Sequence, residues 1–372
     1  MKNIPLRHRI GTVLLLIVAL PVIAEAQTNA PAATQTNAPT ATQTNAPAAK
    51  PPPAVRKFDP LLFAAPFLLG DGGDPNAAVG KDDPLKALAW LDNVVIGKGG
   101  GRDLHAEVAY PVNAPRPMPA IILVHGGGWG YGGPRPIHNM VSFPGNFTAR
   151  FAKQGYFTVF TEYRLSGEAK WPAQIQDCEL AVRWLRANAA KYGVDPNRIG
   201  IWGYSAGGHL VACMATMADV KEYQGDGGYP GVSSAVQAVV DWFGATDFTS
   251  PYFITPQPNK ISNGTSVAIQ NVMGMPYAQN PGAWKSASPV FYVKSDDPPV
   301  LIVHGDVDQW IPVDQASEFD AALTKAGVTH QLVIVKNGKH SFVPKVGNTT
   351  DPTGPEIQKI TNDFLAKYLK AP

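Results

Sequence analysis

The stretch RIGIWGYSAGGHLVACM, residues 198–214, places one serine between an apolar run and a helix-prone segment. Residues 198–202 are short and mostly apolar and predict a buried strand, whereas residues 209–217 predict a helix. Ser205 lies between them, with a glycine two positions before it and another two positions after it. A serine on so sharp a strand-to-helix turn needs small neighbours at both places, because larger side chains would collide with the backbone. We therefore predict that Ser205 is a nucleophile; a glycine-rich turn with a surface serine is the alternative.

Short apolar runs alternate with helix-periodic segments along the rest of the chain. Continuous apolar runs are typical of strands buried in a parallel sheet. Apolar residues at helical spacing mark residues 171–192, and Gly193 is suited to end that helix. Further helices are expected at residues 314–326 and 355–369. This alternation predicts an α/β fold. The other strand candidates are residues 92–96, 104–110, 120–124, 157–163, 236–242, 300–304 and 331–335.

A second glycine-rich stretch, HGGGW at residues 125–129, directly follows the predicted strand 120–124. Acyl transfer develops a negatively charged oxygen, and backbone N–H groups that no side chain shields can stabilise it. We predict that Gly127 and Gly128 supply two such donors and that Ala206 supplies a third. A merely flexible glycine loop is the alternative.

A nucleophilic serine needs a base, and the base needs a carboxylate to orient it. The predicted strand at 300–304 runs into HGDVDQWIP, residues 304–312, where Asp306 and Asp308 compete for the role of the acid. The last predicted strand is followed by a loop that presents His340. The order serine, aspartate, histidine is that of the α/β-hydrolase arrangement. We therefore expect an α/β-hydrolase fold, with a mostly parallel eight-stranded sheet flanked by helices.

From residue 92 to residue 369 the chain resembles exported α/β-hydrolase esterases close to the hormone-sensitive-lipase-like carboxylesterases and the bifunctional acetyl and feruloyl esterases. The resemblance implies a serine esterase with Ser205 as nucleophile and His340 as base. In this family the acid is the fifth residue of the HGDVDQWIP block, which implies Asp308 as the acid and Asp306 as a turn residue. The blocks that carry the resemblance are HGGGW at 125–129, EYRLS at 162–166, WPAQIQDCELAVRWLRANA at 171–189, GYSAGGHL at 203–210, DWFGATDF at 241–248, HGDVDQWIP at 304–312 and GKHSF at 338–342.

Aromatic residues beside these blocks bear on the substrate. Flat aromatic walls suit sugars or a hydroxycinnamoyl group, and we expect Trp129, Tyr204 and Trp310 to contact the substrate. Trp310 stands where the family usually has a smaller residue, which predicts a narrow pocket. Residues 249–288 fall where such hydrolases carry a small cap. Short-chain acyl or hydroxycinnamoyl esters of plant polysaccharides are therefore the expected substrates.

Three alternatives to this substrate class stay open. The first is a general short-chain carboxylesterase or a lipase-like enzyme. The second is a peptidase of the prolyl-oligopeptidase type, which the same histidine-glycine block suggests, although the chain has no room for a propeller domain. The third is a binding module that keeps the fold without the chemistry, although no predicted catalytic position is lost.

Charge and motifs exclude several partners and cofactors. The chain has 31 basic and 29 acidic residues, and residues 1–26 hold the whole excess. A neutral remainder gives no electrostatic reason to expect nucleic acid or an anionic membrane. No HExxH motif is present, and the glycines at 97–101 do not fit a phosphate-binding loop. We expect no metal or organic cofactor, and a small-molecule or polysaccharide ester as the partner; the oligomeric state stays open.

The amino-terminal segment has the features of a cleaved export signal. Residues 1–26 combine a basic start, an apolar stretch at 10–23 and the small residues Ala24 and Ala26. An uncleaved anchor is the alternative, but Pro21 interrupts a stretch that is already short for a bilayer. We expect a protein that is secreted or periplasmic and that does not stay inserted in the membrane after the signal is removed.

The chain after the signal divides into a spacer and one domain. Residues 27–53 repeat the unit QTNAPAAT with small changes and hold no large apolar side chain, which predicts a disordered linker. Residues 54–372 are expected to form the catalytic domain. The two cysteines in the chain, Cys178 and Cys213, either form a disulfide, as export permits, or are small buried hydrophobic residues.

Overall fold

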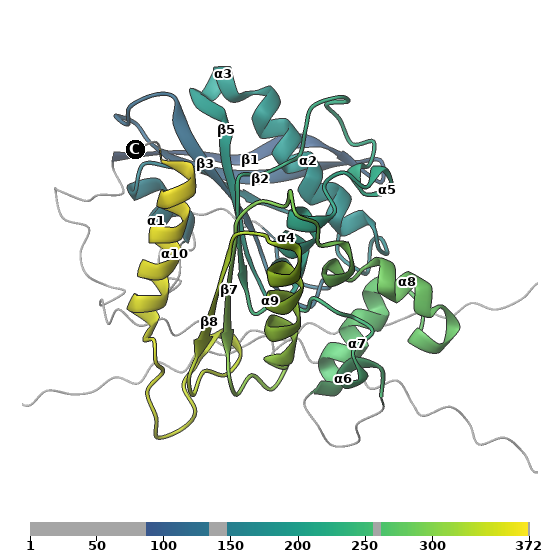
Figure 1. The fold of residues 1–372 in the computed structure, drawn as a ribbon. Helices are drawn as coiled ribbons and strands as arrows, with labels where there is room; N and C mark the ends of the chain where they lie inside the picture. The colour runs from purple at the N-terminus through teal and green to yellow at the C-terminus, as the bar shows by residue number, and fades with distance from the viewer. Residues whose placement is uncertain (1–86, 134–146, 256–261, 371–372) are drawn as a thin grey trace, which may run out of the picture. The chain divides into compact units, whose positions relative to one another are not determined.

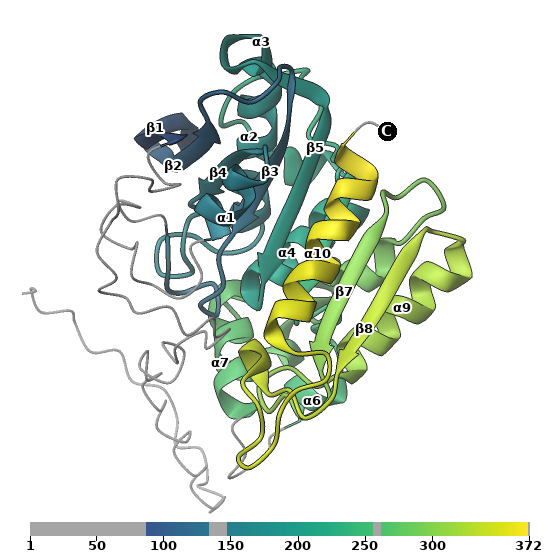
Figure 2. The ribbon, with the colours of Figure 1, turned by 90° about the vertical axis from the view of Figure 1, so that its left-hand side faces the viewer.

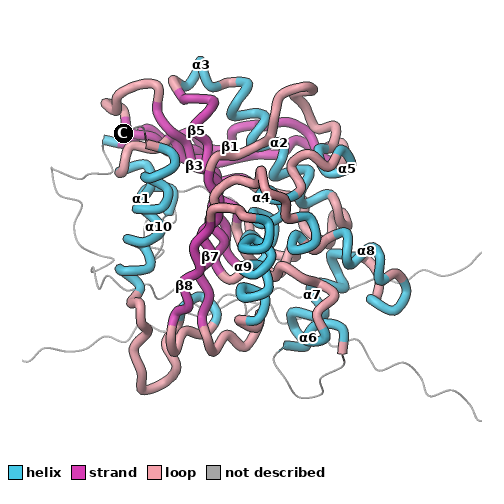
Figure 3. Tube along the Cα trace, viewed as in Figure 1, coloured by secondary structure: helices cyan, strands magenta, loops and turns pink. Residues whose placement is uncertain are grey.

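The structure, a computed structural model, describes residues 87–133, 147–255 and 262–370. Its centre is an eight-stranded sheet in the order β1-β2-β4-β3-β5-β6-β7-β8, drawn in magenta in Figure 3. The pairs β1·β2 and β2·β4 are antiparallel, and all other neighbours are parallel, which confirms the predicted fold class. The strands are β1 (Leu88–Gly99), β2 (Arg102–Pro111), β3 (Met118–Val124), β4 (Phe157–Thr161), β5 (Val194–Tyr204), β6 (Ala238–Trp242), β7 (Val300–Gly305) and β8 (His330–Val335).

Helices cover both faces of the sheet, so its middle strands are buried on both sides. In β3 every residue is buried, and successive side chains enter opposite layers, with Ile121 in one hydrophobic cluster and Ile122 in the other. Figures 1 and 2 show α1 and α10 on one face and α2, α4 and α9 on the other. These helices are α1 (Phe147–Lys153), α2 (Ala173–Ala187), α4 (Ala206–Thr216), α9 (Asp314–Ala326) and α10 (Gly354–Leu369).

The helix expected at 171–192 is interrupted near its end. It divides into α2 and a short α3 (Ala189–Tyr192), and the side-chain amide of Asn188 donates to the carbonyl of Trp184 at 2.8 Å. Such side-chain bonds to the backbone compete with continued helix, which accounts for the break at this residue. Gly193 ends α3 in the left-handed region, at φ 65°, as predicted.

The chain between β6 and β7 forms short helices in place of one crossover helix. A backbone hydrogen bond joins this connection to the segment before α2, where the N–H of Trp171 donates to the carbonyl of Val272 at 2.9 Å. Part of this connection, residues 256–261, lies outside the described residues, and its role as a cap stays a prediction. The helices of this connection are α6 (Pro251–Ile254), α7 (Ser262–Met273), η4 (Tyr277–Gln279), α8 (Pro281–Ser286) and η5 (Pro289–Tyr292). A further short helix, α5 (Lys221–Gln224), precedes β6.

The structure decides between the two alternatives for the cysteines. Cys178 in α2 and Cys213 in α4 are both buried free thiols. Burial raises the pKa of each thiol well above its ordinary value, which keeps both groups protonated and unreactive. They are therefore packing residues, and no disulfide joins them.

The predicted signal at residues 1–26 and the repeat linker at 27–53 lie outside the described residues. Within the ranges that the structure does describe, no helix has both the length and the apolar character that crossing a membrane requires.

Helix α10 provides a test of the packing. Leu365 is fully buried against the sheet, and its Cδ2 lies 3.4 Å from the place a Cβ would take on Gly200 of β5. We expect Leu365→Ala to lower the free energy of unfolding by about 2–5 kcal/mol, because it leaves a cavity in a closed layer. Urea denaturation of the full chain measures this. Lys367→Ala on the exposed face of α10 is the control, with an expected change within about 0.5 kcal/mol; equal midpoints for the two variants would contradict the layer assignment.

Candidate active site

Ser205 occupies a sharp turn between the end of β5 and the start of α4. Its backbone is strained, with φ 56° and ψ −120°. A Cβ on Gly203 would lie 2.4 Å from the carbonyl oxygen of Gly207, and a Cβ on Gly207 would lie 2.2 Å from that of Val124. Both distances are impossible for a real side chain, so this turn requires glycine at both places. The close approach also brings the first turn of α4 against the end of β3.

His340 connects this serine to a carboxylate. Its Nε2 lies 3.0 Å from the Oγ of Ser205, and its Nδ1 lies 2.7 Å from Oδ2 of Asp308. A carboxylate can only accept, so Nδ1 donates to Asp308 and Nε2 is left to accept the hydroxyl proton of Ser205. The structure thus brings together the three residues that the sequence singled out, from the loops after β5, β7 and β8.

Asp308 is the carboxylate that faces the histidine, and Asp306 does not. The Oδ1 of Asp308 accepts from the backbone N–H groups of Trp310, at 2.8 Å, and Ile311, at 3.0 Å, which fixes its orientation. Burial opposes the ionised carboxylate, but the charge of His340 and the hydrogen bonds to histidine outweigh it and hold the pKa of Asp308 well below its usual range. Asp306 is exposed, and its N–H donates to the carbonyl of Val335.

Backbone strain is concentrated around these residues. Positive φ angles are costly for residues with a side chain and persist only where the surroundings impose them. His340 itself is followed by two such residues, and its ring packs edge-on against Phe243 with the centroids 4.7 Å apart. The strained non-glycine residues near the site are Trp129, Ser205, Phe243, Ser341 and Phe342.

The predicted oxyanion loop lies beside the start of α4. Gly127 and Gly128 both have positive φ, at 109° and 58°, and a Cβ on Gly127 would lie 2.2 Å from the carbonyl oxygen of Tyr131. Ala206 opens α4 next to Ser205. The contact of Gly207 with the end of β3 therefore places these three backbone positions at one edge of the sheet, although their role as donors stays a prediction.

Trp129 points away from the surface, contrary to the expectation that it contacts the substrate. Its indole is 1% exposed, and its Nε1 donates to Nδ1 of His209 at 3.2 Å. The other ring nitrogen of His209 lies 2.8 Å from the carbonyl of Ala287, to which it donates. Burial lowers the pKa of His209 to about 4, so the ring stays neutral and can accept from Trp129. The indole anchors the glycine loop to α4 and to the residue after α8.

Tyr204 and Trp310, the other two predicted substrate contacts, are partly or largely buried. The ring of Tyr204 lies against Gly126 of the glycine loop, where a Cβ would come within 2.9 Å of it. Trp310 is 9% exposed and packs on α7, where a Cβ on Gly264 would lie 2.6 Å from the indole. The hydroxyl of Thr265 donates to the carbonyl of Trp310 at 2.9 Å. Trp310 therefore ties the loop of Asp308 to α7, and its substrate contact stays a prediction.

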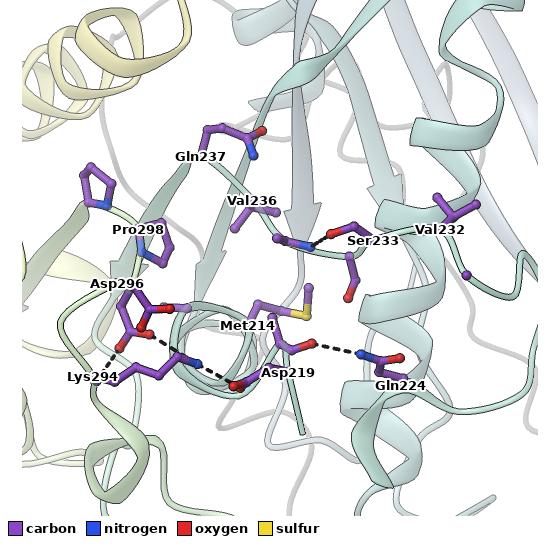
Figure 4. Close-up of a pocket in the computed structure, with 17 residues that line it drawn as sticks. Met214, Asp219, Gln224, Val232, Ser233, Val236, Gln237, Lys294, Asp296 and Pro298 are labelled. Atoms are coloured by element: carbon purple, nitrogen blue, oxygen red, sulfur yellow. Dashed lines mark hydrogen bonds and ion pairs between the residues drawn. The ribbon is translucent and has the colours of Figure 1, made fainter. Parts of the chain in front are cut away.

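Two cavities lie at opposite ends of the strands. One, of about 310 Å³, borders the glycine loop and α7. The other, of about 730 Å³, lies before the first residues of β6 and β7, away from the loops that carry Ser205 and Asp308. Figure 4 shows Lys294 of this larger cavity pointing toward Asp219, with 2.8 Å between Nζ and Oδ1. The smaller cavity is lined by Gly128, Gly130, Tyr131, Ser166, Gly167, Lys170, Ala268 and Asn271.

The described part of the chain was found to hold no candidate metal centre. Nowhere in residues 87–133, 147–255 and 262–370 do three or more histidine, cysteine or acidic side chains gather in an arrangement that could hold a metal ion.

Comparison with known proteins assigns the chain to a family. Residues 106–323, more than half of the sequence, match the BD-FAE family. The chain belongs to the BD-FAE family. Esterase LipQ of Mycobacterium tuberculosis (strain ATCC 25618 / H37Rv) is 35% identical over 68% of this chain and 58% of its own length. The chain thus spans little more than half of this curated relative.

Two solved structures share the fold of this BD-FAE member. A truncated carbohydrate esterase from gut microbiota is 29% identical, with a TM-score of 0.60 over 75% of this chain and 96% of its own. An acetyl ester-xyloside bifunctional hydrolase from Caldicellulosiruptor lactoaceticus is 26% identical, with a TM-score of 0.52 over 64% of this chain and 79% of its own. Both support the α/β-hydrolase fold.

The two aspartates of the HGDVDQWIP block can be distinguished by the reactivity of Ser205. We expect Asp308→Asn to slow labelling of Ser205 by a fluorophosphonate by up to about 10⁴-fold, because an amide favours the wrong tautomer of His340. Asp306→Asn is the matched control and should label within about threefold of the wild type, since its side chain is exposed. The rate is followed by mass spectrometry of the intact protein. Equal rates for the two variants would contradict the assignment of the acid.

Proposed function

We propose that the protein is a carboxylic ester hydrolase that acts through Ser205, His340 and Asp308. The observation that carries the proposal is the continuous series of hydrogen bonds from the serine hydroxyl through the imidazole, at 3.0 Å and 2.7 Å, to a buried carboxylate. Membership of the BD-FAE family and the esterase names of the similar proteins support the same activity.

The first half of the proposed reaction acylates the serine. The Oγ of Ser205 attacks the ester carbonyl carbon while Nε2 of His340 takes the hydroxyl proton. The carbonyl oxygen becomes negatively charged, and the N–H groups of Gly127, Gly128 and Ala206 stabilise it. When the tetrahedral intermediate collapses, the bond to the alcohol oxygen breaks. His340 returns its proton to that oxygen, and the alcohol leaves.

The second half hydrolyses the acyl-enzyme. Water gives a proton to Nε2 of His340 and attacks the acyl carbon through the same kind of intermediate. The bond to Oγ of Ser205 then breaks, the serine regains the proton from His340, and the carboxylic acid is released. Asp308 stays ionised throughout and stabilises the imidazolium that forms twice in each cycle.

The nucleophile is tested by Ser205→Ala. We expect a loss of about 10⁴- to 10⁶-fold in kcat for p-nitrophenyl acetate, with thermal unfolding close to that of the wild type. The control is Ser233→Ala, at an exposed serine that borders the cavity at the other end of the strands and should keep full activity. If Ser205→Ala kept more than a tenth of the wild-type rate, the mechanism would be wrong.

We further propose that the enzyme acts after export, on short-chain acyl or hydroxycinnamoyl esters of plant polysaccharides. The amino-terminal sequence of residues 1–26 supports export. Two similar structures, those of a carbohydrate esterase and an acetyl ester-xyloside bifunctional hydrolase, support the substrate class. The cavity beside the glycine loop, at about 310 Å³, is at the low end of the range for small-molecule sites. Gly128 is the residue that this cavity shares with the proposed oxyanion loop, so we propose that the cavity receives a short acyl group.

The acyl preference is tested with p-nitrophenyl esters from acetyl to dodecanoyl, together with acetylated xylan and methyl ferulate. We expect kcat/KM to be highest for acetyl and to fall steeply with length, since each methylene that finds no room forgoes about 0.8 kcal/mol of burial. Trp310→Ala should raise the relative rate for longer chains by opening space against α7. An optimum at eight carbons or more in the wild type would instead favour a lipase. An unchanged profile in Trp310→Ala would place the restriction elsewhere.

A further inference from the structure

The cavity beside the glycine loop has one charged residue among the described residues that line it. This residue is Lys170, in the segment between β4 and α2, and Gly128 of the proposed oxyanion loop borders the same cavity. Ser166 and Asn271 add a hydroxyl and an amide, and no acidic side chain belongs to this described lining. An anionic group in the cavity therefore meets a positive charge and no negative one.

Lys170 is held in position at its stem and at its head. Its Nζ donates to the carbonyl of Ser166 at 2.7 Å and to the carbonyl of Asn271, in α7, at 2.9 Å. Its stem packs at Gly274, where a Cβ would lie 3.0 Å from Cγ of Lys170. A side chain that is already ordered loses little further rotamer freedom when a ligand binds. The ammonium group is therefore fixed at the cavity before any ligand arrives.

The charge of Lys170 has no counterion in the part of the chain that the structure describes. Its two acceptors are neutral carbonyls, whereas an ammonium group has three N–H donors. Glu168, the nearest carboxylate in the sequence, pairs instead with Arg102, at 2.8 Å. One N–H and the positive charge of Lys170 are therefore available to a ligand.

We propose that Lys170 selects acyl groups that end in a carboxylate, so that the substrates include monoesters of short dicarboxylic acids such as succinic acid. The inference rests on the proposed function, because it names an acyl group that the same site takes. Hydrolysis adds one water across the ester bond and releases the alcohol and the diacid. Lys170 determines specificity in this role and does not touch the reacting atoms.

A carboxylate fits Lys170 better than a neutral oxygen does. The hydroxyl of a hydroxycinnamoyl group can accept the third N–H, but it leaves the positive charge unpaired. A carboxylate accepts the same N–H and supplies the counterion, and such charge-assisted hydrogen bonds are roughly twice as strong as neutral ones. Because Lys170 is exposed, water and salt screen this attraction, and the expected preference is moderate.

Two methyl esters of equal chain length test the inference. Monomethyl succinate and methyl butyrate both have a four-carbon acyl group, and the first ends in a carboxylate where the second ends in a methyl group. We expect the wild type to prefer the succinate by about tenfold in kcat/KM at low salt and neutral pH. Release of methanol, followed by proton nuclear magnetic resonance, measures both rates.

Two variants of Lys170 separate its charge from its packing. Lys170→Met keeps the stem and removes the charge, so we expect the preference to disappear while the rate for methyl butyrate stays within about threefold of the wild type. Lys170→Arg keeps the charge and should retain a preference for the succinate. Lys285→Met is the matched control, since Lys285 is an exposed lysine in α8 that is not among the residues lining the cavity; its preference should equal that of the wild type.

A further measurement needs no variant and therefore does not depend on the folding of one. Raising the salt concentration from about 0.05 M to 1 M shortens the range of electrostatic attraction, so the preference of the wild type should shrink while its rate for methyl butyrate changes little. Equal rates for the two esters at low salt, or a preference that persists in Lys170→Met or at high salt, would overturn the inference. Failure of the proposed function is distinguishable, because then neither ester is hydrolysed.

Discussion

The first turn of α4 lies so close to the end of β3 that no side chain fits between them. Gly207 is the residue at this contact, with the carbonyl of Val124 where its Cβ would be. One steric constraint thereby fixes two features of the site. It sets the strained turn that presents Ser205 to His340, and it holds the glycine loop after β3 against the same helix terminus. Ser205 makes its contact with His340 from this turn, with 3.0 Å between Oγ and Nε2.

The buried aromatic and histidine side chains explain why the glycine loop can be rigid although glycine is flexible. Trp129 has φ 57°, and its indole N–H donates to the neutral ring of His209. The other ring nitrogen of His209 donates to the carbonyl of Ala287. Conformational freedom that three glycines introduce is removed by one anchored indole. The loop can thus expose its backbone N–H groups although it is rich in glycine.

Much of the sheet and the meeting of the three proposed catalytic residues followed from sequence pattern, because strand runs and glycine spacing are local signals. The direction of a side chain is not local. Trp129 follows the glycine loop in sequence, yet its backbone has a positive φ and its indole lies in the core. The residues next to it in the sequence do not predict this direction of the side chain. Asp306 and Asp308 were equivalent by position after a strand, and the family pattern decided between them; the structure adds the backbone N–H groups that orient Asp308.

The connection from β6 to β7 has a consequence for how such proteins diversify. These two strands pair directly, Val239 with Val300, whatever the intervening chain does. The connection leaves the sheet at the edge that holds Ser205 and forms several short helices instead of one packed crossover. A change of length in this connection therefore leaves the pairing of β6 with β7 and the turn of α4 in place. Under the proposed function, editing this one connection would change the acyl or alcohol groups that fit, while Ser205, Asp308 and His340 would be left unaltered.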